Sequence, residues 1–230
     1  MTRLLTLMLS CLLLSLAACS QPQDEVIRFG LASAPANLDP RYATDAASAR
    51  INRLLYQRLV DFDDRIRPVP ALASWEVLSP THYRFHLQAG RAHFHDGSTL
   101  NARDVAATYH SVLDTDRPSA HAGTLKLIEK INVLDNDTLD FILNRADPLF
   151  PGYLVIGLLP ADGIENNHPF HESPLGSGPF QLRDWPEPGR LSLTRLNDGQ
   201  VIEFQKIGDP TVRVLKLLVI DVKRWHGTYY

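Results

Sequence analysis

Cysteine is nearly absent from this sequence of 230 residues, which has two, Cys11 and Cys19. Both lie close to the N-terminus, so the rest of the chain can form no disulfide and offers neither a thiolate nucleophile nor a cysteine ligand for a metal. The sequence also has no excess of basic residues, and its formal net charge at pH 7 is −3. This charge gives no indication of a nucleic-acid partner.

Signatures of catalysis are also absent from the sequence. It has no H-E-x-x-H pair, and no serine stands at a recognisable nucleophile elbow. A glycine cluster at residues 176–178 is not followed by Lys-Ser or Lys-Thr, as a phosphate-binding loop requires. We therefore predict that the protein is not an enzyme and uses no cofactor.

Apolar sequence is plentiful, because 44% of the residues are hydrophobic, which suffices for one or two globular domains. The pattern predicts a mixed α and β fold. Strands are expected over residues 26–31, 138–143, 190–196 and 201–204, and a last helix over 211–218. Residues 125–133 suit either a helix or a strand. An amphipathic helix that opens at Thr44 or Asp45 would place four leucine and isoleucine side chains on one face: Ile51, Leu54, Leu55 and Leu59.

The clearest pattern lies in residues 71–113. Polar and apolar side chains alternate over residues 82–88, which predicts a half-buried strand with His82 and His86 on its solvated face. The core face of this strand and of the next helix should bring together Phe85, Leu87, Val105 and Tyr109. A second short strand is expected over residues 91–95. Asn101 and Asp104 then form a variant of the capping box that opens a helix.

The N-terminus has the features of an export signal. Arg3 precedes an apolar run over residues 4–16, which is too short to span a bilayer stably. Leu16-Ala17-Ala18-Cys19 resembles the bacterial lipobox, in which the cysteine is lipidated and becomes the first residue. We therefore expect a signal peptide over residues 1–18 and a lipid-anchored tether over residues 19–25, which would hold the protein at a membrane outside the cytoplasm.

Several motifs, in a fixed order, resemble those of one protein family. Ala73-Ser74-Trp75-Glu76 is followed by a strand that ends Phe-x-Leu, then by Phe94-His95-Asp96-Gly97-Ser98-Thr99-Leu100 and Ala102-Arg103-Asp104-Val105. Residues 173–180 add the pattern Pro-x-Gly-x-Gly-Pro-aromatic, whose Gly176 and Gly178 permit positive φ and close backbone approach. This combination is similar to the extracytoplasmic solute-binding proteins of ABC transporters, in the dipeptide, oligopeptide and nickel class known as family 5.

The resemblance implies a fold and a role. It implies the first lobe of a type II periplasmic-binding-protein fold, incomplete here. Residues 26–56 and 174–218 would share the main sheet, and residues 57–173 would form an inserted subdomain. The protein would capture a peptide in the periplasm and deliver it to ABC permease and ATPase subunits, touching the membrane through its lipid anchor alone.

The resemblance also implies ligand contacts. Leu38-Asp39-Pro40 resembles the Leu-Asp-Pro element of the family. In the oligopeptide branch, the segment just after this element offers backbone groups to an extended peptide, as an added strand does. That position falls on Thr44, Asp45 and Ala46. The loop after the helix that opens at Asn101 faces the same cleft in that branch, and this position falls on His121.

The sequence leaves alternative functions open. The family includes nickel and nickel-chelate binding proteins, and His93 and His95 beside Asp96 could ligate a metal, although a structural role is favoured. A non-transport envelope lipoprotein that acts in interaction or sensing is a further alternative. Family members are about twice this length, and residues 219–230 depart from the family pattern. We therefore expect a truncated form with impaired peptide binding.

Overall fold

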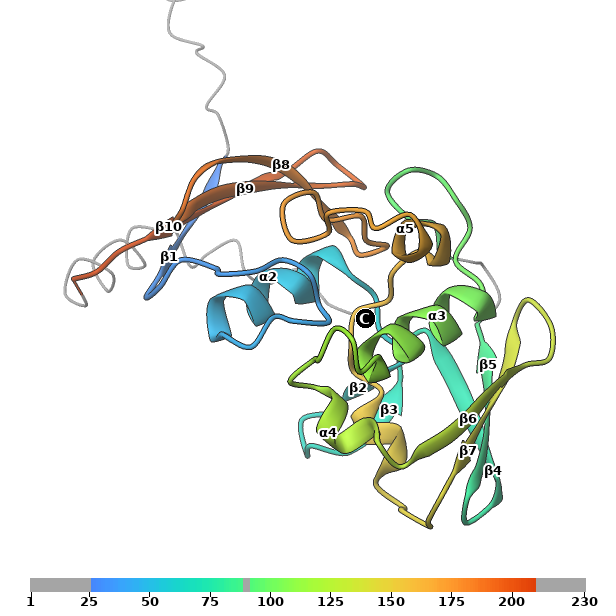
Figure 1. Ribbon diagram of the computed structural model, residues 1–230. Helices are drawn as coiled ribbons and strands as arrows, with labels where there is room; N and C mark the ends of the chain where they lie inside the picture. The colour runs from blue at the N-terminus through green and yellow to red at the C-terminus, as the bar shows by residue number, and fades with distance from the viewer. Residues whose placement is uncertain (1–25, 89–91, 210–230) are drawn as a thin grey trace, which may run out of the picture.

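The computed structural model describes residues 26–88 and 92–209. In these residues the chain forms two four-stranded β-sheets, a small two-stranded hairpin and a few short helices, which confirms the predicted mixed α and β class. Figure 1 shows the two larger sheets at opposite ends of the molecule, each with one principal helix beside it. The predicted helix over residues 211–218 and the tail over 219–230 lie outside the described residues.

The first sheet joins the beginning of the described chain to its end. Its strands lie in the order β1 (Ile27–Leu31), β10 (Val201–Lys206), β9 (Arg190–Arg195) and β8 (Phe180–Glu187). β1 runs parallel to β10, and the other neighbours are antiparallel. The β9–β10 hairpin turns at Gly199, whose φ is +75°, a conformation that glycine adopts without steric cost. Strand β8 was not predicted.

Helix α2 (Ala46–Leu55) covers the apolar face of the first sheet (Figure 1). Ile51 and Leu55 are buried in one cluster with side chains of β9 and β10, because these positions recur on one face of the helix. The prediction that Leu59 shares this face was wrong. The helix ends at Leu55, and Leu59 lies four residues beyond in an extended segment that packs into the other core.

The second sheet has the order β4 (Ala73–Ser79), β5 (His82–Leu87), β7 (Thr138–Leu143) and β6 (Ile128–Val133), and all its neighbours are antiparallel. Helix α3 (Ala102–Leu113) packs on its inner face. Phe85 from β5 and Tyr109 from α3 both contact the Phe141 ring in T-shaped geometry, at centroid distances of 5.3 and 5.7 Å. The predicted core is therefore confirmed, with Leu87 partly buried at its margin.

The start of α3 follows the predicted capping box in detail. The side chain of Asn101 accepts a hydrogen bond from the backbone N–H of Arg103, and Asp104 accepts one from the N–H of Asn101. Asp104 also accepts a bond of 2.8 Å from the N–H of Ala161. This second bond fixes the beginning of α5 (Ala161–Glu165) against α3.

Two local predictions need correction, and one open alternative is decided. Residues 92–95 form no strand, because His93 makes a single β-bridge with Thr99 and a turn follows at once. Of the two alternatives for residues 125–133, the strand is confirmed as β6, which follows the short helix α4 (Ala122–Leu125). His82 is not merely solvated, since its Nε2 lies 2.9 Å from Oδ2 of Asp140, which also pairs with Arg84.

Two segments of the chain, residues 56–60 and 154–158, connect the two sheets. They are flanked by a hairpin and by a 3₁₀ turn. The hairpin consists of β2 (Val60–Phe62) and β3 (Pro68–Pro70), and the turn is η2 (Phe150–Tyr153). The N–H of Leu158 donates to the carbonyl of Gln57 at 2.9 Å, and Val60 bonds in the same way to Leu154. Residues 56–60 and 154–158 therefore run side by side between the cores.

The glycine cluster at residues 176–178 lies directly on the end of α2. A Cβ atom at Gly176 would approach the Leu55 oxygen to 1.9 Å, and one at Gly178 would approach the Leu54 oxygen to 2.3 Å. The glycines are therefore required for close approach, as predicted, but neither has the positive φ that the sequence also allowed. His95 completes the junction, because its N–H donates to the carbonyl of Gly176 and its Nε2 to that of Gly178.

Candidate functional site

The predicted ligand residues gather at one end of α2. Asp45 is the N-cap, and its side chain accepts a hydrogen bond from the N–H of Ser48 at 2.8 Å. Burial acts to raise the pKa of Asp45, but hydrogen bonds from Ser48 and from the backbones of Ala36 and Ala47 together outweigh it and hold the pKa below its usual value. Thr44 and Ala46 on either side are exposed. The Asp45 carboxylate is thus occupied by hydrogen bonds that cap the helix. Residues 44–46 can therefore bind a ligand mainly through their backbone groups.

The backbone of Thr44 has spare hydrogen-bonding capacity. Within the part of the chain that the structure describes, neither its N–H nor its carbonyl has a hydrogen-bond partner. Buried backbone groups are almost always paired, whereas exposed groups like these can bond water or a ligand. Thr44 therefore presents one donor and one acceptor at the surface, as an edge strand does.

His121 lies beside this segment, as the resemblance implied. It precedes helix α4, and its Nε2 is 2.9 Å from the carbonyl oxygen of Ala43. Because a carbonyl can only accept, Nε2 carries the hydrogen. Ser119 makes a parallel contact, in which its hydroxyl donates to the carbonyl of Arg41. These two bonds hold residues 117–121 against residues 41–46, and we call the paired segments the seam.

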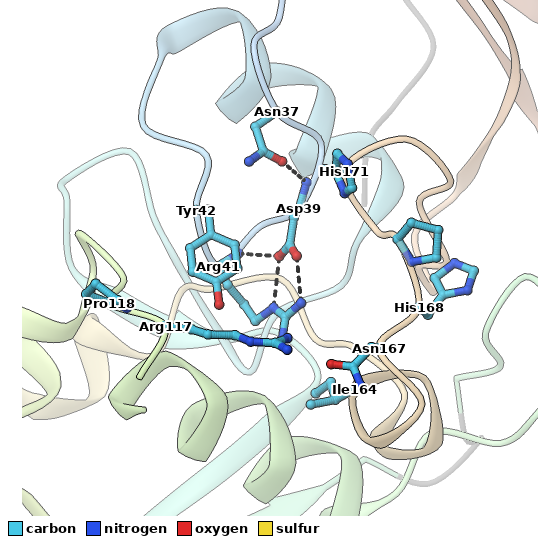
Figure 2. A pocket seen from close by; sticks show the side chains of 11 residues that line it. Asn37, Asp39, Arg41, Tyr42, Arg117, Pro118, Ile164, Asn167, His168 and His171 are labelled. Atoms are coloured by element: carbon cyan, nitrogen blue, oxygen red, sulfur yellow. Dashed lines mark hydrogen bonds and ion pairs between the residues drawn. The ribbon is translucent and has the colours of Figure 1, made fainter. Parts of the chain in front are cut away.

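A pocket of about 390 Å³ continues from the seam. Residues from three parts of the chain line it: Asn37, Asp39, Arg41, Tyr42, Arg117, Pro118, Ile164, Asn167, His168, Pro169 and His171. Figure 2 shows the guanidinium groups of Arg41 and Arg117 toward the middle of this ring, with His168 and His171 on the opposite side. Sequence reasoning did not identify the pocket.

A buried ion pair forms the floor of the pocket. Nε of Arg41 donates to Oδ1 of Asp39 at 3.0 Å, and its Nη2 donates to Oδ2 at 2.7 Å. The Arg41 guanidinium also lies over the rings of Tyr42 and Phe170, 5.2 and 5.3 Å from their centroids. Burial alone would lower the pKa of Arg41, but the bond and charge of Asp39 raise it overall, so the group stays charged.

The far wall of the pocket comes from the loop before the glycine cluster. His168 is held there by Nε2, which donates to the carbonyl of Ser173 at 2.7 Å, and by an edge contact with Phe170. Asn167 adopts a φ of +54°, which turns the chain sharply after α5. His171 is exposed beside it.

The structure separates the histidines that could have formed a metal site. His95 donates through Nε2 to Gly178, while His93 faces Thr99 at 3.4 Å, so the two imidazoles have different partners. Burial lowers the pKa of His95, and its bond to Gly178 and the charge of Asp96 offset this in part. Among residues 26–88 and 92–209, no group of three or more His, Cys, Asp or Glu side chains is placed to hold a metal ion.

The order of motifs, the two sheets and the junction at the glycine cluster agree with a match to a known family. The model of the bacterial extracellular solute-binding proteins, family 5 (middle part), matches residues 66–223. The chain belongs to this family. Its members are binding proteins rather than enzymes.

Known relatives bind chemically different ligands on this fold. The oligopeptide-binding protein AppA of Bacillus subtilis is 26% identical over 208 residues, which are 82% of this chain and 38% of AppA. AgaA from A. tumefaciens R10, solved with agropinic acid, gives a TM-score of 0.76 at 25% identity over 84% of this chain and 42% of AgaA. NikZ from Campylobacter jejuni, solved with Ni(L-His), gives a TM-score of 0.75 at 22% identity. The match covers 85% of this chain and 42% of NikZ.

Two facts follow from these comparisons. The fold is that of type II periplasmic binding proteins, and the chain spans less than half the length of the relatives it matches. Within the described residues, no helix has the length and apolar character needed to cross a membrane. Cys19 and the expected signal segment lie outside those residues, so lipidation stays a prediction.

Proposed function

We propose that this chain forms the first lobe of the substrate-binding component of a peptide-type ABC importer. It captures di- or oligopeptides outside the cytoplasmic membrane and contributes to their delivery to the permease and ATPase subunits. Membership in the family supports the binding role, and the name of AppA supports a peptide ligand. The unpaired backbone groups of the exposed Thr44 are the observation that carries the proposal for this chain.

The mode of binding that we propose is addition of a strand. An extended peptide laid along residues 44–46 would bond its own backbone to the N–H and carbonyl of Thr44. Residues 117–121 hold the seam in position, since His121 and Ser119 satisfy the carbonyls of Ala43 and Arg41. The site would therefore be largely formed before the peptide arrives, which lowers the entropic cost of binding.

One lobe should bind weakly. Ligand pockets bury most of a ligand's surface, whereas the seam can contact a peptide from one side. We therefore expect affinity weaker than micromolar for this chain.

The test is a titration with trialanine and with an analogue methylated at each amide nitrogen, followed by NMR chemical shifts. Strand addition predicts that trialanine shifts signals of residues 44–46 and that the methylated analogue, which lacks main-chain donors, loses most of that effect. Equal binding of the two compounds would exclude it.

We also propose the division of the chain into two subdomains. Residues 26–56 and 174–218 would form the main-sheet unit, and residues 57–173 the inserted unit. The separate hydrophobic clusters around α2 and around α3 support this division, as do the paired crossings at residues 56–60 and 154–158. Residues 1–18 would be removed as a signal peptide, and a lipid on Cys19 would anchor the mature protein through residues 19–25.

A further inference from the structure

We infer that the pocket next to the seam is a carboxylate-binding subsite, which receives a negatively charged group of the bound solute through Arg41 and Arg117. This inference deepens the proposed function and rests on it for the identity of the solute. The pocket shares residues 41 and 42 with the segment that leads to Thr44, and residues 117 and 118 with the other side of the seam. A ligand lying along the seam would reach it directly.

The side chains that line the pocket favour an anion. They include two guanidinium groups and two imidazoles, but a single carboxylate, that of Asp39. Asp39 is already occupied, because both of its oxygens accept hydrogen bonds from Arg41. One positive charge of the two guanidinium groups is therefore left without a balancing carboxylate in the pocket.

Arg41 has hydrogen-bonding capacity that its partners do not use. Its Nε and Nη2 bond to Asp39, whereas Nη1 makes no hydrogen bond with any residue in the described part of the chain. The residue as a whole is 7% exposed, but Nη1 is not one of the buried side-chain atoms that lack a partner in the described residues, so this atom keeps contact with solvent. A donor in this position can exchange a water molecule for an acceptor on the ligand. The ion pair with Asp39 and the rings of Tyr42 and Phe170 hold the guanidinium in place before a ligand arrives.

Arg117 supplies the second charge from the rim. Its side chain is exposed, and among the described residues no carboxylate lies within ion-pair distance of it. In Figure 2 it extends from the loop beside Pro118 toward Arg41. Two guanidinium groups on one cavity repel a cation, and their planar arrays of N–H donors match the geometry of a carboxylate.

The size of the pocket fits this assignment. Its volume of about 390 Å³ falls at the small end of the range for ligand pockets, roughly 300–1,000 Å³. It can hold one terminal residue or one acidic side chain rather than a whole oligopeptide. The carboxylate could come from the C-terminus of a peptide or from an acidic side chain, and the experiment separates these two sources.

The test compares the unchanged chain with Arg117→Ala and with the control Arg65→Ala. Arg65 is also an exposed arginine, but it lies in the β2–β3 turn away from the pocket. Four probes are titrated by NMR chemical shift: trialanine, its C-terminal amide, Ala-Glu-Ala amide and succinate. Because Arg117 is exposed, its loss should leave the melting temperature unchanged.

We expect trialanine, Ala-Glu-Ala amide or both to bind about tenfold more tightly than trialanine amide, as one charge-assisted hydrogen bond implies. A gain for trialanine assigns the subsite to the C-terminal carboxylate, and a gain for Ala-Glu-Ala amide assigns it to an acidic side chain. Arg117→Ala should abolish the gain, whereas Arg65→Ala should keep it. The inference is overturned if neither carboxylate improves binding or if the gain persists in Arg117→Ala.

The two proposals fail in different ways. If the peptides bind but carboxylate and amide forms are equivalent, the carboxylate subsite is wrong and the peptide-binding function stands. If no peptide binds while succinate binds in a manner that depends on Arg117, the subsite stands and the peptide-binding function is wrong.

Discussion

Replacement of Gly176 by alanine should destabilise the protein more than its small size suggests. The added Cβ would lie 1.9 Å from the carbonyl oxygen of Leu55, which is backbone and cannot rotate away. Relief requires a shift of residues 176–178 relative to α2. That shift would weaken two bonds of 2.8 Å, from His95 N–H to the Gly176 oxygen and from Gly178 N–H to the Leu55 oxygen.

The size of the effect follows from these contacts. Overpacking of a close contact costs about 1–3 kcal/mol, and each weakened hydrogen bond adds about 1 kcal/mol. We therefore expect a loss of roughly 3–5 kcal/mol in the free energy of unfolding. For a domain of this size, each kcal/mol lowers the melting temperature by about 2–4 °C, so the total decrease should be about 6–20 °C.

Thermal unfolding followed by circular dichroism measures this loss. Gly123→Ala is the matched control, because a Cβ there has no atom within 4 Å. Gly123 also lies within helix α4, where alanine is the better helix former, so the control should be neutral or slightly stabilising. A Gly176→Ala protein that melts with the control would show that the glycine cluster is not packed against α2.

Three further predictions concern the core, the junction and the N-terminus. Phe85→Ala should cost about 3–5 kcal/mol in urea unfolding, because Phe85 is fully buried between Trp75 and Phe141, and an unchanged midpoint would refute the packing of β5. The pKa of His95 in the folded protein lies below its ordinary 6.5, so the unfolded chain binds this proton first, and the free energy of unfolding should fall as the pH drops below about 6.5. In His95→Gln this part of the pH dependence should vanish, and a pH profile identical to that of the unchanged protein would contradict the assignment. Mass spectrometry of the mature N-terminal peptide should find a lipid on Cys19, and an unmodified Cys19 or a different cleavage site would refute the anchor.

Sequence patterns correctly predicted the elements that are determined by residues close together in the chain. The alternation over residues 82–88 and the capping box at Asn101 depend on neighbours within a few positions, and both are present in the structure. Strand β8 was missed because Pro186 and nearby charged residues interrupt its alternation. The structure accommodates them by irregular pairing with β9 at Asp184 and at Glu187.

The parts of the site that the sequence did not reveal depend on distant contacts. Ser119 and Arg41, whose bond holds the seam, are 78 positions apart, and His95 meets Gly178 across 83. Arg41 and Arg117 each lie in a loop, where side chains follow no periodic pattern. The sequence therefore could not show that the two residues line the same pocket. The family resemblance implied that His121 and the segment after Leu38-Asp39-Pro40 contact the ligand, which stays a prediction, and the structure places the two side by side.

The central claim is that the seam contacts a peptide through its backbone, and NMR mapping with trialanine tests it most directly. Amide signals of the chain are assigned, and their shifts are followed as the peptide rises to millimolar concentration. The account predicts weak, saturable shifts concentrated at residues 42–46 and 117–121, with smaller changes elsewhere. Shifts confined to the outer faces of the two sheets, or no shifts at all, would contradict it.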